Sequence, residues 1–220
     1  MIYCVEERKS EMKYDHVLWD FNGTLLNDVQ ICVDCLNELL AHHGSGRYTE
    51  EEYKNIFTFP IKEYYERAGF DFEKTGYDVL AEEWTEYYRS RSDLVLYDGA
   101  KTTLEKLAAA GAHQSIISAS ERTTLFSQTR VLGIDGFFDE MLGLDNIHAR
   151  SKENIAMLWR ERNPLSKAVF IGDTTHDCEV ARAIDADCIL IPNGHQARRI
   201  LETTSATICD GIKDIPQMLL

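Results

Sequence analysis

The feature that most constrains the fold is a regular alternation of strand-like and helix-like segments after residue 92. Short apolar runs suited to buried strands are separated by segments with three- and four-residue apolar spacing, which is typical of helices. The predicted helices cover residues 101–110, 121–132, 152–162 and 177–184, and the predicted strands cover 115–118, 168–173, 188–192 and a segment that follows Asp139. Alternation on this scale favours right-handed crossovers and a mostly parallel sheet with helices on both faces, so we expect an α/β fold.

The preceding part of the chain has a different pattern. Residues 16–19 form one short apolar run, and no strand pattern interrupts residues 28–94, so we expect an all-helical insertion after the first strand. The helices predicted there are residues 28–43, a segment opened by the capping box Thr49–Glu52, residues 60–68, and residues 72–91 as one long helix or two shorter ones. Residues 1–12 show neither pattern.

Two of the apolar runs end in carboxylates. Asp20 follows the first run and enters a Gly-Thr turn, while Asp173 follows the run that begins at residue 168, with Asp177 four residues later. Taken alone, the first segment fits a strand followed by an Asx turn equally well. Ligands of open α/β sheets bind beyond the carboxyl ends of the strands, and oxygen ligands of this kind suit Mg²⁺. Together the two clusters therefore indicate one metal site.

Two further polar residues lie between these clusters. Ser118 ends a predicted strand and Lys152 opens a predicted helix, and each alone is an ordinary residue for its position. Taken in order, four motifs of the haloacid dehalogenase-like hydrolases are matched by Asp20, Ser118, Lys152, and Asp173 with Asp177. From about residue 15 to its C-terminus the chain thus resembles this family, in which most members are phosphatases, and in particular its phosphoglycolate phosphatase-like subgroup.

The resemblance implies an architecture. Members of the subgroup have a Rossmann-like core with a helical cap inserted between the first and second motifs. Carried onto this sequence, the core comprises residues 1–27 and 95–220 and the cap residues 28–94. Such caps close over small substrates, and substrate choice usually resides in them.

The resemblance also implies roles for individual residues. Asp20 is expected to attack phosphorus and form an aspartyl-phosphate, and Asp177 to orient Lys152 or a metal-bound water. Mg²⁺ is expected to be held by Asp20, Asp173 and the backbone carbonyl of Asn22. The phosphoryl group is expected to contact Ser118, Ala119, Lys152, Gly23 and Thr24.

Asn22 departs from the family pattern. Most phosphatases of this type carry a second Asp two residues after the nucleophile, which protonates the leaving group and then activates water. An amide can do neither, and such assistance is typically worth about 10²- to 10⁴-fold. Four explanations stay open: a substrate with a good leaving group, another residue or water in this role, a long-lived phosphoenzyme, or a weakly active or inactive relative.

Composition limits the partners. The formal net charge of −14 argues against the nucleic-acid backbone as a partner, whereas a small phosphorylated metabolite can bind where Lys152 and Mg²⁺ offset the repulsion. No apolar run approaches the roughly 20 residues of a membrane span, and the N-terminus lacks the pattern of a secretory signal. We therefore expect a cytoplasmic protein without a membrane partner, as a monomer or homodimer.

The remaining reactive side chains carry less information. Cys32 and Cys35 have CxxC spacing inside a predicted helix, without a second pair for zinc, so we expect reduced thiols and no structural disulfide, Cys4 included. His176 and His195 are expected at most to support the residues that contact substrate. Two function classes follow: a Mg²⁺-dependent phosphatase, or a weakly active or non-catalytic module that binds phosphorylated metabolites or a protein.

Overall fold

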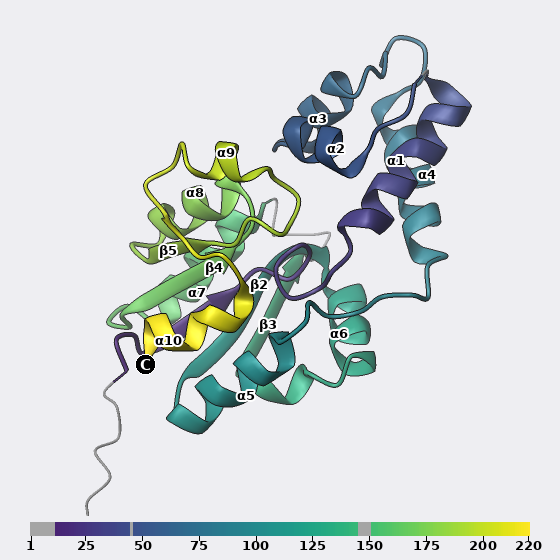
Figure 1. Cartoon of the computed structure of the whole chain (residues 1–220). Coiled ribbons are helices and arrows are strands. Elements are labelled where there is room, and N and C mark those ends of the chain that lie inside the picture. The colour runs from purple at the N-terminus through teal and green to yellow at the C-terminus, as the bar shows by residue number, and fades with distance from the viewer. Residues whose placement is uncertain (1–11, 45, 145–150) are drawn as a thin grey trace, which may run out of the picture.

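The computed structural model describes residues 12–44, 46–144 and 151–220, and its centre is a six-stranded parallel sheet (Figure 1). The strand order is β3-β2-β1-β4-β5-β6, so the first strand of the chain lies in the middle. The strands are β1 (His16–Trp19), β2 (His113–Glu121), β3 (Glu140–Leu144), β4 (Ala168–Gly172), β5 (Asp187–Leu190) and β6 (Thr207–Ile208). The predicted parallel α/β sheet is confirmed.

Helices cover both faces of the sheet. They are α5 (Ala100–Ala110), α6 (Arg122–Val131), α7 (Lys152–Arg162), α8 (Thr175–Ala183), α9 (Arg198–Leu201) and α10 (Ile215–Leu219), with 3₁₀ turns at Asp135–Phe137 and Ile212–Asp214. Because successive strand residues point to opposite faces, Val17 and Trp19 join the core under α5 and α10, while Leu18 joins the core under α7 and α8. Burial on both faces explains why the strands read as continuous apolar runs.

The segment between β1 and α5 forms four helices that lie to one side of the sheet (Figure 1). These helices have a separate hydrophobic core. These are α1 (Val29–His43), α2 (Glu50–Ile56), α3 (Ile61–Arg67) and α4 (Tyr77–Arg89). The capping box at Thr49 is confirmed, because its hydroxyl accepts from the Glu52 amide while the Glu52 carboxylate accepts from the Thr49 amide. We call α1–α4 the inserted helices; the domain boundaries at residues 28 and 94 stay predictions.

Several boundaries differ from the predicted ones. The 72–91 segment forms one helix that begins at Tyr77, because Asp71 stabilises a local turn by accepting from the Glu73 amide at 3.0 Å. The helix predicted from Asp177 begins at Thr175, since Thr174 caps it. The short elements α9, β6 and α10 lack a periodic signal and escaped prediction.

The cysteines and the length of the helices bear on two further expectations. The described cysteines, at positions 32, 35, 178, 188 and 209, are free thiols, whereas Cys4 and most of residues 1–12 lie outside the described residues. Burial raises the pKa of Cys35 to about 11, which makes it a poor nucleophile at neutral pH. Within the described ranges, the helices are too short or too polar to cross a membrane.

Candidate active site

The sheet topology gathers the candidate residues at one point. Strand β1 lies between β2 and β4, with Trp19 in register with Ile116 on one side and Ile171 on the other. Asp20 therefore emerges beside Ser118 of β2 and beside Asp173, which follows β4. This is the point where the strand order reverses, and in open α/β sheets it is where ligands bind.

Lys152 forms a buried ion-pair cluster with two of the carboxylates. Its ammonium group donates to Asp20 Oδ1, and to Asp177 Oδ1 at 2.5 Å. A cation in the first turn of a helix meets the positive end of the helix dipole, and burial further opposes its charge. The charges of Asp177 and Asp20 outweigh burial and raise the pKa of Lys152, so the side chain is an ammonium ion at neutral pH.

Asp177 is fixed by the start of α8. Its Oδ2 accepts from the amides of Asp173 at 3.1 Å and Thr174 at 2.9 Å, and from the Thr174 hydroxyl at 2.8 Å. Burial alone raises the pKa of this carboxyl, but the Lys152 charge and these hydrogen bonds bring it below its usual value. Gly172 is required here, because a Cβ at this position would overlap the Asp177 carboxyl. Asp177 thus holds Lys152 in place.

Asp173 is held by two donors. The Thr24 hydroxyl donates to its Oδ1 at 2.8 Å, and the His195 amide donates to its Oδ2 at 2.6 Å. The Gly23 amide donates to Asp28 Oδ1 at 3.0 Å. In this structure Thr24 and Gly23 therefore orient carboxylates, and their contact with a phosphoryl group stays a prediction.

The carboxylates fit a divalent cation. Oxygens of Asp20, Asp173 and Asp177 lie within 4.8 Å of one another, and all three side chains are buried. Burial, together with the neighbouring carboxylates, raises the pKa of both Asp20 and Asp173. This excess of buried negative charge is what a cation with oxygen ligands neutralises, so the donor set suits Mg²⁺.

Loss of the Thr24 hydroxyl is expected to weaken metal binding. A Thr24→Val variant keeps the side-chain shape but removes the donor that orients Asp173. Partners of metal ligands are typically worth about 10- to 100-fold in metal affinity, so the Mg²⁺ concentration for half-maximal binding should rise by that factor. Calorimetric Mg²⁺ titration checks this, with Thr58→Val as a control, because the Thr58 hydroxyl donates to the Phe59 carbonyl at 3.3 Å and lies outside the site. Equal affinities in Thr24→Val and the parent would contradict it.

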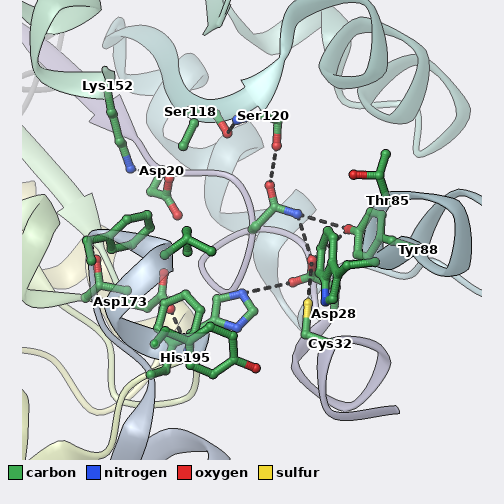
Figure 2. A pocket seen from close by; sticks show the side chains of 18 of the residues that line it. Asp20, Asp28, Cys32, Thr85, Tyr88, Ser118, Ser120, Lys152, Asp173 and His195 are labelled. Carbon is green, nitrogen blue, oxygen red and sulfur yellow. Dashed lines mark hydrogen bonds and ion pairs between the residues drawn. The ribbon is translucent and has the colours of Figure 1, made fainter. Parts of the chain in front are cut away.

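These residues open into a cavity of about 490 Å³ between the sheet and the inserted helices. Ser118 and Ala119 line it from β2, and the Ser118 hydroxyl accepts from the Ser120 amide at 3.0 Å. Figure 2 shows Lys152 and Asp20 on one side of the cavity, with Tyr88 of α4 on the other. The cavity is therefore shared between the core and the inserted helices.

The side chain of Asn22 makes three hydrogen bonds, to Asp28, Tyr88 and Ser120, which are labelled in Figure 2. Its Nδ2 donates to Asp28 Oδ2 at 2.7 Å and to the Tyr88 hydroxyl at 3.0 Å, while its Oδ1 accepts from the Ser120 hydroxyl at 2.6 Å. Tyr88 also donates to Asp28 Oδ2 at 2.7 Å. Asp28 is fully buried, and its role escaped prediction because the sequence presented it only as the start of a helix.

Comparison with known proteins decides the family. The family model of haloacid dehalogenase-like hydrolases matches residues 17–191. The chain belongs to this family. Its α/β Rossmann-like fold and the predicted resemblance are thereby confirmed.

Individual relatives of this haloacid dehalogenase-like hydrolase are distant. Pyrophosphatase PpaX of Halalkalibacterium halodurans is 23% identical over 172 residues, covering 76% of this chain and 78% of that protein. A phosphoglycolate phosphatase of Pseudomonas savastanoi pv. phaseolicola is 22% identical over 216 residues, covering 90% and 77%. A haloacid dehalogenase-like family hydrolase from Streptococcus pneumoniae has the same fold, with TM-score 0.80, 18% identity, and coverage of 93% of this chain and 98% of that one. These names are consistent with the predicted phosphoric monoester hydrolase.

His176 and His195 of this haloacid dehalogenase-like hydrolase differ in position. His176 lies outside the cavity lining, and its ring packs at a tilt of 31° on Phe59 with ring centroids 4.7 Å apart. His195 is buried in the site, where its Nε2 lies 3.4 Å from Asp28 Oδ1 and its Nδ1 lies 2.9 Å from the Tyr53 hydroxyl. Burial lowers its pKa, but Asp28 and the charges of Asp173 and Asp20 outweigh this and raise the pKa to about 9.

The raised pKa of His195 predicts a loss of stability at alkaline pH. The folded value of about 9 exceeds the ordinary value of 6.5, so the contribution is fully present below pH 6.5 and is lost as pH rises through 9. Unfolding free energy of metal-free protein should fall by up to about 3 kcal/mol over this window. Urea unfolding in EDTA at pH 6.5 and 9.5 measures the fall, and His195→Gln should remove most of it. An equal fall in both proteins would contradict this assignment.

Proposed function

We propose that this hydrolase is a Mg²⁺-dependent phosphatase of small phosphorylated metabolites that forms an aspartyl-phosphate at Asp20. One observation carries the proposal. The buried Asp20 carboxylate faces a cavity at the carboxyl end of the sheet, paired with Lys152 and grouped with Asp173. This arrangement supplies a nucleophile, a cation and oxygen ligands at one place.

The roles of the protein groups follow from their contacts. An Asp20 oxygen attacks phosphorus as the bond to the leaving-group oxygen breaks, and water then cleaves the resulting acyl phosphate. Lys152 offsets the charge of the nucleophile and the transferred group, Asp177 holds Lys152, and Ser118 donates to a phosphoryl oxygen. Asp20, Asp173 and the backbone carbonyl of Asn22 would hold Mg²⁺, which would neutralise carboxylate and phosphoryl charge.

Asn22 limits the substrates. Its amide neither gives nor takes a proton in this chemistry, and its hydrogen bonds are already made to Asp28, Tyr88 and Ser120. A leaving group that is stable as an anion needs no such proton, so acyl phosphates, aryl phosphates and pyrophosphate should react better than alkyl phosphates.

The named relatives support the reaction class but divide over the substrate. Phosphoglycolate is an alkyl phosphate and pyrophosphate has a phosphate leaving group, and this chain is similar to enzymes named for each. A second candidate, a non-catalytic module that binds phosphorylated metabolites or a protein, is favoured by Asn22 alone. Cytoplasmic location and a monomeric or dimeric state stay predictions.

Phosphate release over a panel of acetyl phosphate, phenyl phosphate, pyrophosphate and an alkyl phosphate tests the proposal. We expect release that requires both Mg²⁺ and Asp20, with Asp20→Asn protein as the blank, and rates that rank by leaving group. Phosphate release that persists in the Asp20→Asn protein would show that Asp20 is not the nucleophile. No release from any substrate would favour the binding module.

A further inference from the structure

We infer that the leaving group of the substrate is an apolar aromatic ring, so that the enzyme acts on phosphate esters of phenol-type hydroxyls. The inference rests on the proposed phosphatase function and adds the substrate class. Three independent observations carry it: the wall of the cavity opposite Asp20, the distribution of charge around it, and the hydrogen bonds of Asn22.

The wall contributed by the inserted helices is aromatic. Besides Tyr53 and Tyr88, the apolar and aromatic side chains of this wall include Phe57, Phe59, Ile61, Tyr64, Tyr65 and Trp84. Trp84 stacks on Tyr88 with ring centroids 4.9 Å apart at 15°, and Phe57 packs on Tyr64 at 5.2 Å. The hydroxyls of Tyr53 and Tyr88 are bonded to His195 and Asp28, so their polar tips are already used. This wall suits a flat apolar group.

The size of the cavity agrees with such a group. Its volume of about 490 Å³ lies within the range of about 300–1,000 Å³ found for pockets that bury drug-sized ligands, so it has room for a ring. A glycolate or a second phosphate would leave most of the aromatic wall uncovered. A ring next to the phosphoryl group would cover it.

The charge of the lining opposes a second anionic group. Among the described residues that line the cavity, the basic side chains are Lys152, His195 and Arg89. Lys152 is paired with Asp20 and Asp177, His195 lies against Asp28, and Arg89 pairs with Glu121 at 3.2 Å on the exposed rim. Five lining side chains are acidic, against these three. A carboxylate or second phosphate on the substrate would therefore find no uncommitted basic partner in the described lining.

Asn22 is committed to its hydrogen bonds and supplies no proton, which favours leaving groups that are stable as anions. Without a proton donor at this position, an alkoxide leaves badly, whereas a phenol-type oxygen with a pKa of about 10 leaves as a stable anion. Shape and leaving-group chemistry thus point to the same class. Acetyl phosphate has a leaving group that is stable as an anion, but it has no ring to cover the aromatic wall.

Binding and turnover separate this inference from the proposed function. With Mg²⁺ present, calorimetry compares benzylphosphonate with 3-phosphonopropionate, which mimic phenyl phosphate and phosphoglycolate without being hydrolysed. We expect benzylphosphonate to bind about 10- to 100-fold more tightly, the gain for burying one ring. Turnover compares phenyl phosphate with cyclohexyl phosphate, and we expect similar KM values and a kcat about 10²-fold higher for phenyl phosphate.

Substitutions in the aromatic wall test whether its side chains cause the preference for benzylphosphonate. Trp84→Ala should weaken benzylphosphonate binding about tenfold while Trp84→Phe stays within about threefold, because the ring is kept. Val79→Ala, on an exposed position of the same helix, should change nothing. Ile61→Lys, which adds a cation to the wall, should improve binding of 3-phosphonopropionate relative to benzylphosphonate.

Equal or weaker binding of benzylphosphonate would overturn the aromatic assignment even if acetyl phosphate is hydrolysed, and the proposed function would then stand. Tight binding of benzylphosphonate without turnover of any ester would instead overturn the proposed function and the substrate assignment with it. Hydrolysis of phenyl and cyclohexyl phosphate at equal kcat would overturn the leaving-group step.

Discussion

An Asp20→Asn variant is expected to lose Mg²⁺-dependent phosphate release by about 10⁴-fold or more, the scale seen when a nucleophile is removed. The same variant should unfold at a higher urea concentration than the parent in EDTA. Burial raises the pKa of Asp20, so its ionised form destabilises the folded protein at neutral pH. Removing the charge also leaves Lys152 paired one-to-one with Asp177. We expect a gain of about 1–2 kcal/mol in unfolding free energy.

Asp177→Asn is the matched control, because it makes the same chemical change against the same lysine. The pKa of Asp177 is lowered, so its ionised form stabilises the folded state above the ordinary value of 3.8, and this contribution is lost as pH falls through the lower folded value. We therefore expect the control to lose about 3 kcal/mol at pH 7, as for one partner removed from a buried pair. If both variants lose stability equally, the ionised Asp20 carboxylate does not destabilise the folded protein, and the prediction is wrong.

Opposite stability effects of two neighbouring carboxylates have a functional meaning. Asp177 is surrounded by donors from the start of α8, whereas Asp20 shares one lysine and faces the cavity. The first arrangement positions Lys152, and the second keeps an under-neutralised carboxylate at the place where the proposed metal ion and phosphoryl group would bind. Such a site costs stability in the metal-free protein and supplies binding energy for the cation.

The central sheet could be predicted because its strands are buried on both faces. Val17, Leu18 and Trp19 all lie in cores, so the sequence there is apolar without interruption, and the carboxylates that end such runs stand out. Strand β6, with two residues, and helix α9, with four, carry no comparable period. The start of α4 was wrong by one turn or more because a local Asp71 turn competes with the helix.

The residues of the candidate site were likewise predictable only where they belong to a sequence motif. Asp20, Lys152 and Asp177 belong to motifs whose order along the chain is informative, and the structure brings them into contact. Asp28 and Tyr88 are 60 positions apart, and each is ordinary at its position, Asp28 before the start of α1 and Tyr88 within α4. Their role depends on how the inserted helices pack on the first turn after β1, which no local pattern records.

An Asn22→Asp variant is expected to be strongly destabilised, although it restores the residue usual in the family. The new carboxylate would lie where the amide now donates to buried Asp28 at 2.7 Å, and the donor to Tyr88 would be lost as well. An unpaired buried charge typically costs about 3–5 kcal/mol. Burial raises the pKa of Asp28, but His195 and the other hydrogen bonds bring it below its usual value, so the loss should grow from pH 5 to pH 8 as the new carboxyl at position 22 ionises beside it. Urea unfolding across this range measures it.

Exchanging the two residues, in the double variant Asn22→Asp with Asp28→Asn, should recover part of that loss. One amide again faces one carboxylate, whereas the carboxylate partner of His195 at position 28 is removed. A double-mutant cycle with Asp28→Asn isolates the coupling. The exchanged pair places an ionisable carboxyl two residues after Asp20, so kcat on cyclohexyl phosphate should rise about 10²-fold while phenyl phosphate gains far less. A stable double variant that gains equally on both esters, or on neither, would show that the missing proton donor does not limit the reaction. Asn22→Asp protein as stable as the parent would show that positions 22 and 28 are not coupled, and that the amide is kept for another reason.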